Sequence, residues 1–297
     1  MEYEVTLNGK PLNATIRDVQ TVDRDGAMAD DIRVVILNDT NTNIAEGDLL
    51  ACSFGGYRSG NMSIDRIDSG TKTTVIGAIS VPLCAKEKKT RHWLKVRLFD
   101  IINDVATSCS LSVYYQSVNN YYYENVTQFE ETDLAFLNRL CGREGYALKI
   151  DNNRLVIYDK SVIKDSEPVR AITLSKIVDN KVTFSENPNK TMSVTVKYYA
   201  DRLIEYTATK GTIGEKKTIK EYLADGAEAE RFAKNYLALA KENDVVADAL
   251  ILLDDGIAAG NCVVFEGFGR FDGKYFISEC CHNPESDQTR LLGRKII

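Results

Sequence analysis

The sequence predicts a mainly β protein in which two β regions flank a small α+β insert. Short segments rich in β-branched residues alternate with Gly, Asp and Asn turns at both ends of the chain. A helix-plus-hairpin pattern lies between them, over residues 128–158. The chain has 297 residues, which is too long for one small domain. We therefore predict domains at 1–85, 86–165 and 166–297.

The first region is expected to consist of short strands. Asn8-Gly9 is a strong hairpin turn signal after the strand pattern Val5-Thr6-Leu7. Further strands are expected at 31–37, 49–54, 62–67 and 73–81. Many short strands with Gly and Asp turns are typical of a small barrel or sandwich.

The insert begins with a charged run at 86–92, which we interpret as a solvated linker rather than an anion site. A helix is predicted over 94–109, because apolar residues share one face at Leu98, Ile101, Ile102, Val105 and Cys109. The aromatic cluster at 120–123 is interpreted as packing or an interface rather than a base-stacking platform.

The central stretch, 128–150, is predicted to be a capped helix followed by a strand. Its apolar face comprises Leu134, Leu137, Leu140 and Cys141. Thr132 or Asp133 is the expected N-cap, Glu130 and Glu131 supply charge near the helix start, and Gly142 or Gly145 is expected to end the helix. A turn at 151–153 then leads to a second strand at 155–158. We expect Leu134, Leu137 and Leu140 to be buried against Leu98, Ile102 and Val105.

The last region returns to β structure from about residue 168. A hairpin is expected from 206–210 and 216–221, and one helix from 227–242 with a continuous apolar stripe. Other strands are expected at 170–174, 181–184, 192–199, 245–252, 262–265 and 274–278.

Composition limits the classes of partner. The net charge is −6, from 37 basic and 43 acidic residues, so neither specific nucleic-acid binding nor association with anionic membranes is expected. No apolar run approaches the roughly 20 residues of a membrane span, and no signal peptide is predicted. The seven cysteines are expected to be reduced.

The search for chemistry predicts no catalytic, cofactor-binding or metal-binding residues. The chain has two histidines, His92 and His282, and neither lies beside a nucleophile motif. Cys280-Cys281-His282 is interpreted as buried thiols near a histidine, with a disulfide or metal site as the alternative. The carboxylate pairs at 30–31, 130–131 and 254–255 are interpreted as turns or helix starts.

The chain resembles the phage late control protein D family, the baseplate hub proteins of contractile tails. It is also similar to the hub half of VgrG-type spike proteins. The resemblance is carried, in order along the chain, by residues 29–34, 46–50, 63–67, 98–106, 128–140, 260–269 and 272–275 and by His282.

The resemblance implies two tube-like β-barrel domains flanking a small helix-plus-hairpin domain. It implies a homotrimer without enzymatic activity. The trimer would be a symmetry adaptor that joins the sixfold tail tube protein to the threefold spike protein. It would also contact the tape measure protein and baseplate wedge proteins. Such a hub is located in the baseplate of a virion or phage-tail-like particle and is assembled in the host bacterial cytoplasm. No cofactor is expected. The alternatives are a tail-associated peptidoglycan-degrading enzyme and a carbohydrate-binding receptor-recognition module.

Overall fold

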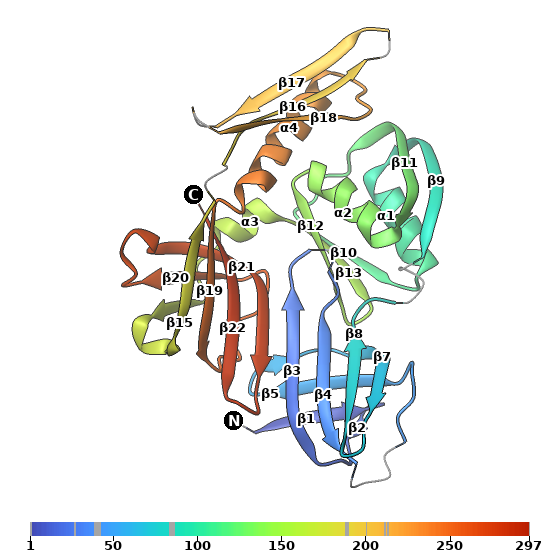
Figure 1. Cartoon of the computed structure of the whole chain (residues 1–297). Coiled ribbons are helices and arrows are strands. Elements are labelled where there is room, and N and C mark those ends of the chain that lie inside the picture. Colours follow the sequence, from blue (N-terminus) through green and yellow to red (C-terminus); the bar gives the residue numbers. More distant parts are fainter. Residues whose placement is uncertain are drawn as a thin grey trace.

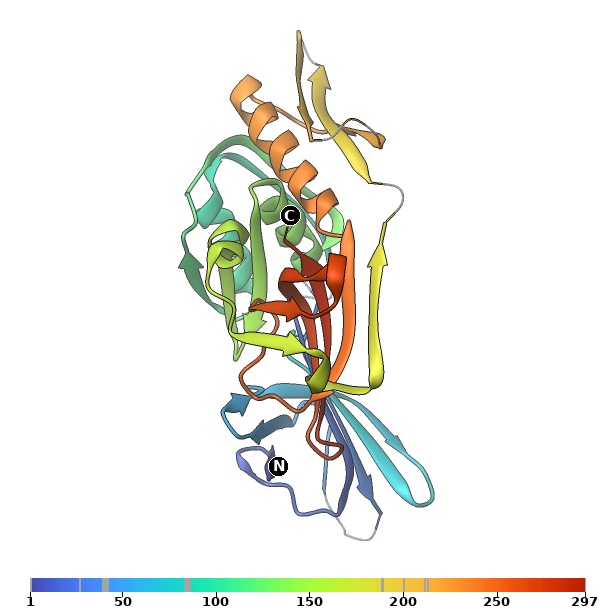
Figure 2. The ribbon, with the colours of Figure 1, turned by 90° about the vertical axis from the view of Figure 1, so that its left-hand side faces the viewer.

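The structure, a computed structural model, describes residues 2–26, 28–38, 43–82, 87–187, 190–199, 201–210, 212 and 214–296. The predicted boundary at residues 85 and 86, and Cys84, lie outside these ranges. The fold is mainly β with few helices, as the sequence predicts. It is elongated, with the N-terminal strands at one end and a small sheet at the other (Figures 1 and 2).

The largest sheet contains strands from both ends of the chain. Its central order is β15-β19-β22-β21-β3-β4-β8-β7-β5-β1-β2, and β6, β14 and β20 pair beside this path. The first region supplies β1 (Tyr3–Leu7), β2 (Lys10–Pro11), β3 (Ile16–Arg24), β4 (Asp31–Leu37), β5 (Leu49–Phe54), β6 (Tyr57–Arg58), β7 (Met62–Ser69) and β8 (Thr73–Ile79). The last region supplies β14 (Arg170–Thr173), β15 (Ile177–Glu186), β19 (Val245–Leu252), β20 (Cys262–Glu266), β21 (Gly273–Asn283) and β22 (Gln288–Lys295).

One pairing joins the two regions. Strand β21 runs antiparallel to β3, with Glu279 opposite Arg24 and His282 opposite Thr21. Each region nevertheless has its own apolar core. One core is centred on residues such as Ile32 and Leu50, and the other on residues such as Phe265 and Tyr275. The sequence indicated two β regions, but it did not indicate that they share one continuous sheet.

The insert combines three helices with two small sheets (Figure 1). Strands β9 and β11 form an antiparallel ribbon, and β10-β13-β12 form a three-stranded sheet in which β10 and β13 are parallel. The elements are β9 (Lys88–Arg97), α1 (Leu98–Ser108), β10 (Ser112–Gln116), β11 (Tyr122–Thr132), α2 (Asp133–Arg143), β12 (Tyr146–Asp151), β13 (Arg154–Asp159) and α3 (Lys160–Asp165).

The structure corrects the start of the first predicted helix of the insert. The charged run is not a linker, because β9 begins at Lys88 and continues to Arg97. The helix begins only at Leu98, four residues after its predicted start at 94. Gln128 to Glu131, which precede the predicted N-cap of the next helix, belong to β11. Cross-strand pairing between β9 and β11 overrides the local helical pattern before Leu98.

The apolar face and the cap of α2 are confirmed. Leu134, Leu137 and Leu140 are buried in the same core as the buried face of α1. Thr132 is the N-cap, and its side chain accepts a hydrogen bond from the Ala135 amide at 3.3 Å. At the other end of the helix, Gly145 takes a left-handed φ of +83°, a conformation that costs little only for a residue without Cβ.

A second small sheet and a long helix extend from the last region. They are β16 (Thr191–Tyr199), β17 (Leu203–Thr209), β18 (Glu215–Lys220) and α4 (Gly226–Lys241). Their buried residues, including Val196 and Phe232, belong to the core of the insert rather than to that of the large sheet. Where the chain divides into independently folding domains therefore stays a prediction.

The hairpin predicted from 206–210 and 216–221 is wrong. Strands β17 and β18 both pair with β16, β17 antiparallel and β18 parallel, so β16 lies between them. Val194 and Val196 of β16 are buried, and the central strand is the most buried of the three. In the described parts of the chain, no helix has the length and apolar character to span a membrane.

Candidate functional site

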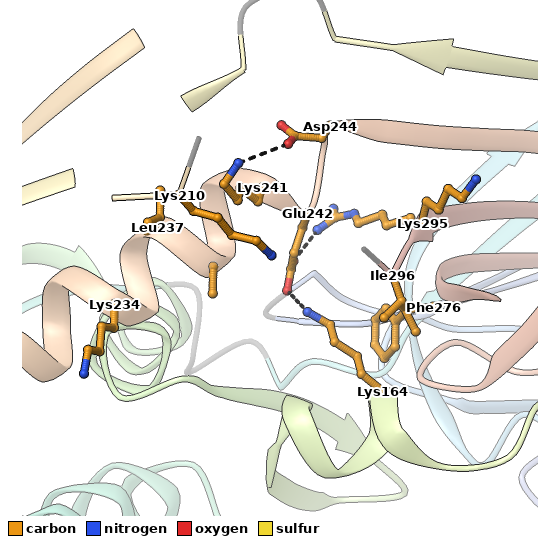
Figure 3. Close-up of a pocket in the computed structure, with 12 residues that line it drawn as sticks. Lys164, Lys210, Lys234, Leu237, Lys241, Glu242, Asp244, Phe276, Lys295 and Ile296 are labelled. Carbon is orange, nitrogen blue, oxygen red and sulfur yellow. Dashed lines mark hydrogen bonds and ion pairs between the residues drawn. The ribbon is translucent and has the colours of Figure 1, made fainter. Parts of the chain in front are cut away.

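A basic cleft lies where α3, α4 and the end of β22 meet (Figure 3). Its volume is about 250 Å³. Six cationic and two carboxylate side chains line it, an excess of four positive charges. The lining residues are Lys164, Lys210, Lys234, Leu237, Ala238, Lys241, Glu242, Asp244, Phe276, Arg294, Lys295 and Ile296. We call this site the basic cleft.

Glu242 is the ionic centre of the basic cleft. It caps the C-terminal end of α4, and its side chain is 6% exposed. Its carboxylate lies 3.2 Å from Lys160 Nζ, 2.9 Å from Lys164 Nζ and 2.9 Å from Arg294 Nη1. Burial alone would raise the pKa of Glu242, but these three cations hold it below its ordinary value. The carboxylate thus ties α3 and β22 to α4.

Asp244 is the second buried carboxylate of the basic cleft. The residue is 3% exposed, and Oδ2 lies 3.6 Å from Lys241 Nζ. Within the described ranges, no protein donor lies within hydrogen-bonding distance of Oδ1. Buried acceptors normally have a donor, so this oxygen is one that a bound group could satisfy. The excess of cationic side chains beside this acceptor suits the basic cleft to binding an anionic group that also carries a hydrogen-bond donor.

A second cavity, of about 460 Å³, lies where the two β regions meet the insert. Lys149 of β12 contacts Asp23 of β3 and lies 3.6 Å from Asp30. Burial raises the pKa of Asp30 to about 7. A carboxyl with such a pKa could serve acid–base chemistry, but backbone amides also hold these groups, Arg24 on Asp30 at 2.7 Å and Ala259 on Asp23 at 2.9 Å. The arrangement is an ionic joint between the large sheet and the insert.

The charged run and the central stretch meet at Asp133. This residue is 1% exposed, and its carboxylate accepts hydrogen bonds from Lys89 at 2.7 Å, from Arg91 and from Gln128 at 3.0 Å. The hydrogen bond with Asp133 raises the pKa of Lys89. Sequence reasoning treated Asp133 only as a cap or a helix-start charge and so missed this network.

The other sequence candidates lie apart from the basic cleft. Cys280 and His282 are fully buried, and Cys280 Sγ lies 3.3 Å from His282 Nε2. Burial lowers the pKa of His282, which favours the neutral ring. Cys281 lies on the opposite face, beside Gln20. Among the described residues, no group of three or more His, Cys, Asp or Glu side chains is placed to hold a metal, and the six described cysteines are buried.

Two of the three predicted carboxylate pairs meet at the second cavity, because Asp30 and Asp255 both line it; the pair at 130–131 does not. Asp254 is paired with Arg170 at 3.0 Å, while the Asp255 carboxylate accepts a hydrogen bond from the Gly56 amide. Asp31 is bound to Arg24 in the large sheet, and Glu131 to Arg139 in the insert.

The aromatic cluster at 120–123 is partly buried, as the packing interpretation requires. Tyr123 is 2% exposed and donates to Glu144 at 2.6 Å, and the Arg231 guanidinium lies 4.2 Å from the centre of the Tyr121 ring. Tyr122 is 47% exposed.

Comparison with solved structures shows that the chain shares its fold with tail proteins. A tail protein from Neisseria meningitidis superposes with a TM-score of 0.79 at 16% identity, over 99% of this chain and 97% of that one. The 43 kDa tail protein of prophage MuSo2 from Shewanella oneidensis gives 0.77 at 13% identity, over 99% and 98%. An Escherichia coli type VI secretion component, described as similar to bacteriophage T4 tail proteins gp27 and gp5, gives 0.62 at 11% identity, over 99% and 77%. No protein-family model and no curated protein matches the sequence.

Proposed function

We propose that this protein is a structural baseplate hub of a contractile phage tail or phage-tail-like particle, related to the late control protein D family. In this role three copies form a ring that joins the sixfold tail tube to the threefold spike. The observation that carries the proposal is the shared fold with two tail proteins, one of them from a prophage, over nearly the full length of all three chains. The same fold in a type VI secretion component that is described as similar to bacteriophage T4 tail proteins supports a role in a tail or tail-like assembly.

The surface of the single chain also supports assembly. Tyr199, Leu203 and Tyr222 are 73%, 53% and 37% exposed and line one hollow on the β17-β16-β18 sheet, together with Lys197 and Lys220. Contiguous exposed aromatic and aliphatic groups rimmed by polar ones are typical of protein interfaces. We propose that this hollow, which we call the tyrosine patch, is covered by another subunit in the particle.

Oligomeric mass tests the trimer. The chain has a mass of 33.2 kDa, so light scattering after size exclusion should give about 100 kDa for the trimer, and a higher mass once a spike protein has joined it. Leu203→Glu should shift the protein toward the monomer, because it places a charge within the tyrosine patch. Lys72→Glu, which makes a larger change of charge on an exposed loop outside the patch, is the control.

A protein that stays monomeric with and without its spike would argue strongly against the hub.

The non-enzymatic role is tested separately, by incubation with purified cell wall. The hub proposal expects no release of peptidoglycan fragments, whereas release would favour the alternative of a peptidoglycan-degrading enzyme. Binding of the isolated chain to glycans would favour the carbohydrate-recognition alternative.

A further inference from the structure

The basic cleft carries more positive charge than its own carboxylates use (Figure 3). Lys164 and Arg294 are engaged by Glu242, and Lys234 is engaged by Glu230 at 2.5 Å. In the described ranges of the chain, no carboxylate forms an ion pair with Lys210 or Lys295. Lys210 is exposed on the cleft wall, and Lys295 is half-buried, with its ammonium donating to the Arg270 carbonyl at 3.0 Å.

The walls of the basic cleft combine these cations with an apolar surface and one buried acceptor. Leu237, Phe276 and Ile296 line it beside the lysines. Asp244 belongs to the same lining, and its buried Oδ1 atom has no donor among the described residues. A ligand that satisfies this set brings carboxylates for Lys210 and Lys295 and a hydrogen-bond donor for Asp244.

These requirements separate the possible anions. Inorganic phosphate and the phosphodiester backbone offer mainly acceptor oxygens, and the negative charge of Asp244 repels them. A peptide with acidic side chains offers both kinds of group, because its carboxylates accept from the lysines while its backbone amides donate. Its aliphatic stems also match the apolar part of the wall.

We propose that the basic cleft binds an acidic peptide segment of a partner protein, with carboxylates on Lys210 and Lys295 and a backbone amide on Asp244. The cleft would bind such a segment whether or not the chain forms a trimer. The charge of the whole protein is −6, so this cleft is a local exception to an acidic chain. An acidic partner would be directed to it by that local field.

The test uses the full chain and a labelled six-residue peptide that alternates Asp and Glu with Gly, and binding is measured by fluorescence anisotropy at low salt. The matched Asn and Gln peptide is the probe control. The Lys210→Gln/Lys295→Gln double variant should weaken binding about tenfold, because two partly solvent-exposed ion pairs are lost and each contributes about threefold. The Lys10→Gln/Lys72→Gln variant makes the same change of charge on exposed residues of the first β region and should bind within about twofold of the unchanged protein.

A second measurement needs no variant. Carbodiimide activation of the bound peptide should join its carboxylates to nearby lysine amines, and mass spectrometry should find the cross-links at Lys210, Lys241 or Lys295. Equal binding of the acidic and the amide peptides would overturn the proposal, as would equal weakening by the two double variants or cross-links spread over the surface. Displacement of the peptide by millimolar inorganic phosphate would show a general anion site and would also overturn it.

Discussion

Replacement of Asp133 by Asn tests whether the buried network under the β9-β11 ribbon stabilises the insert. The amide has the shape of the carboxylate but no charge, so Lys89 and Arg91 each lose a charge-assisted hydrogen bond. Such bonds contribute about 1.5–3 kcal/mol each, and breaking a buried ion pair costs about 3–5 kcal/mol. The side chains of Lys89 and Arg91 are 25% and 23% exposed, so water recovers part of the loss. We expect a decrease of about 3 kcal/mol in the free energy of unfolding.

The single tryptophan is a natural reporter for this experiment. Trp93 lies on β9, stacked on Phe136 of α2 with ring centres 5.2 Å apart. Urea unfolding followed by its fluorescence should show a midpoint lower by about 1 M, for a slope near 3 kcal/mol/M. Glu131→Gln is the matched control. Its ion pair with Arg139 is partly exposed, so the loss should stay below about 1 kcal/mol.

The reasoning would be refuted if Asp133→Asn unfolded within about 0.5 kcal/mol of the unchanged protein, or lost no more stability than Glu131→Gln. Either result would mean that water stabilises Lys89 and Arg91 as much as the Asp133 carboxylate does.

Three further predictions concern the core, the ionic joint and the thiols. Leu137→Asp buries an unpaired carboxylate in the shared core and should cost more than about 4 kcal/mol, giving insoluble protein, whereas Ala135→Asp on the exposed side of α2 should fold normally. A soluble, cooperatively unfolding Leu137→Asp would contradict the burial. Asp30 binds a proton in the folded state up to about pH 7 but in the unfolded state only up to about pH 4, so its contribution to stability is full below pH 4 and is lost as pH rises to 7. Asp30→Asn should therefore flatten the decline in stability between pH 4 and pH 7, a change of at most about 4 kcal/mol; an unchanged profile would contradict it. The buried thiols, including Cys141 with its pKa raised to about 12, should not react with a disulfide reagent at pH 8 until urea is added; rapid labelling of more than one thiol in the native protein would contradict this.

Local patterns predicted the elements whose signals lie within a few neighbouring residues. The apolar face of α2, its Thr132 cap, the left-handed Gly145 and the β12-β13 hairpin all follow from short-range spacing and turn chemistry. The helix α4 was also predicted almost to its ends, because its stripe of apolar residues runs without interruption from Ala229 to Leu237. The class of fold, mainly β with a helical insert, followed from the same signals.

Tertiary pairing decided what these patterns could not. The segment from Lys88 to Arg97 carries charged and apolar residues that fit a linker and a helix, and it becomes a strand because β11 supplies a hydrogen-bonding partner. For the same reason β18 lies against β16 and not against β17.

The basic cleft was beyond the reach of sequence patterns. Its charged residues come from four separate segments of the chain, and no spacing rule connects Lys164 or Lys210 to Arg294. The pairing of β3 with β21 joins residues more than 250 positions apart in the same way. The sequence by itself therefore determined the local elements and the buried faces, since these depend on neighbours along the chain. Only the tertiary structure decided which strands share a sheet and where charges collect, because hydrogen bonding and Coulomb attraction depend on distance in space.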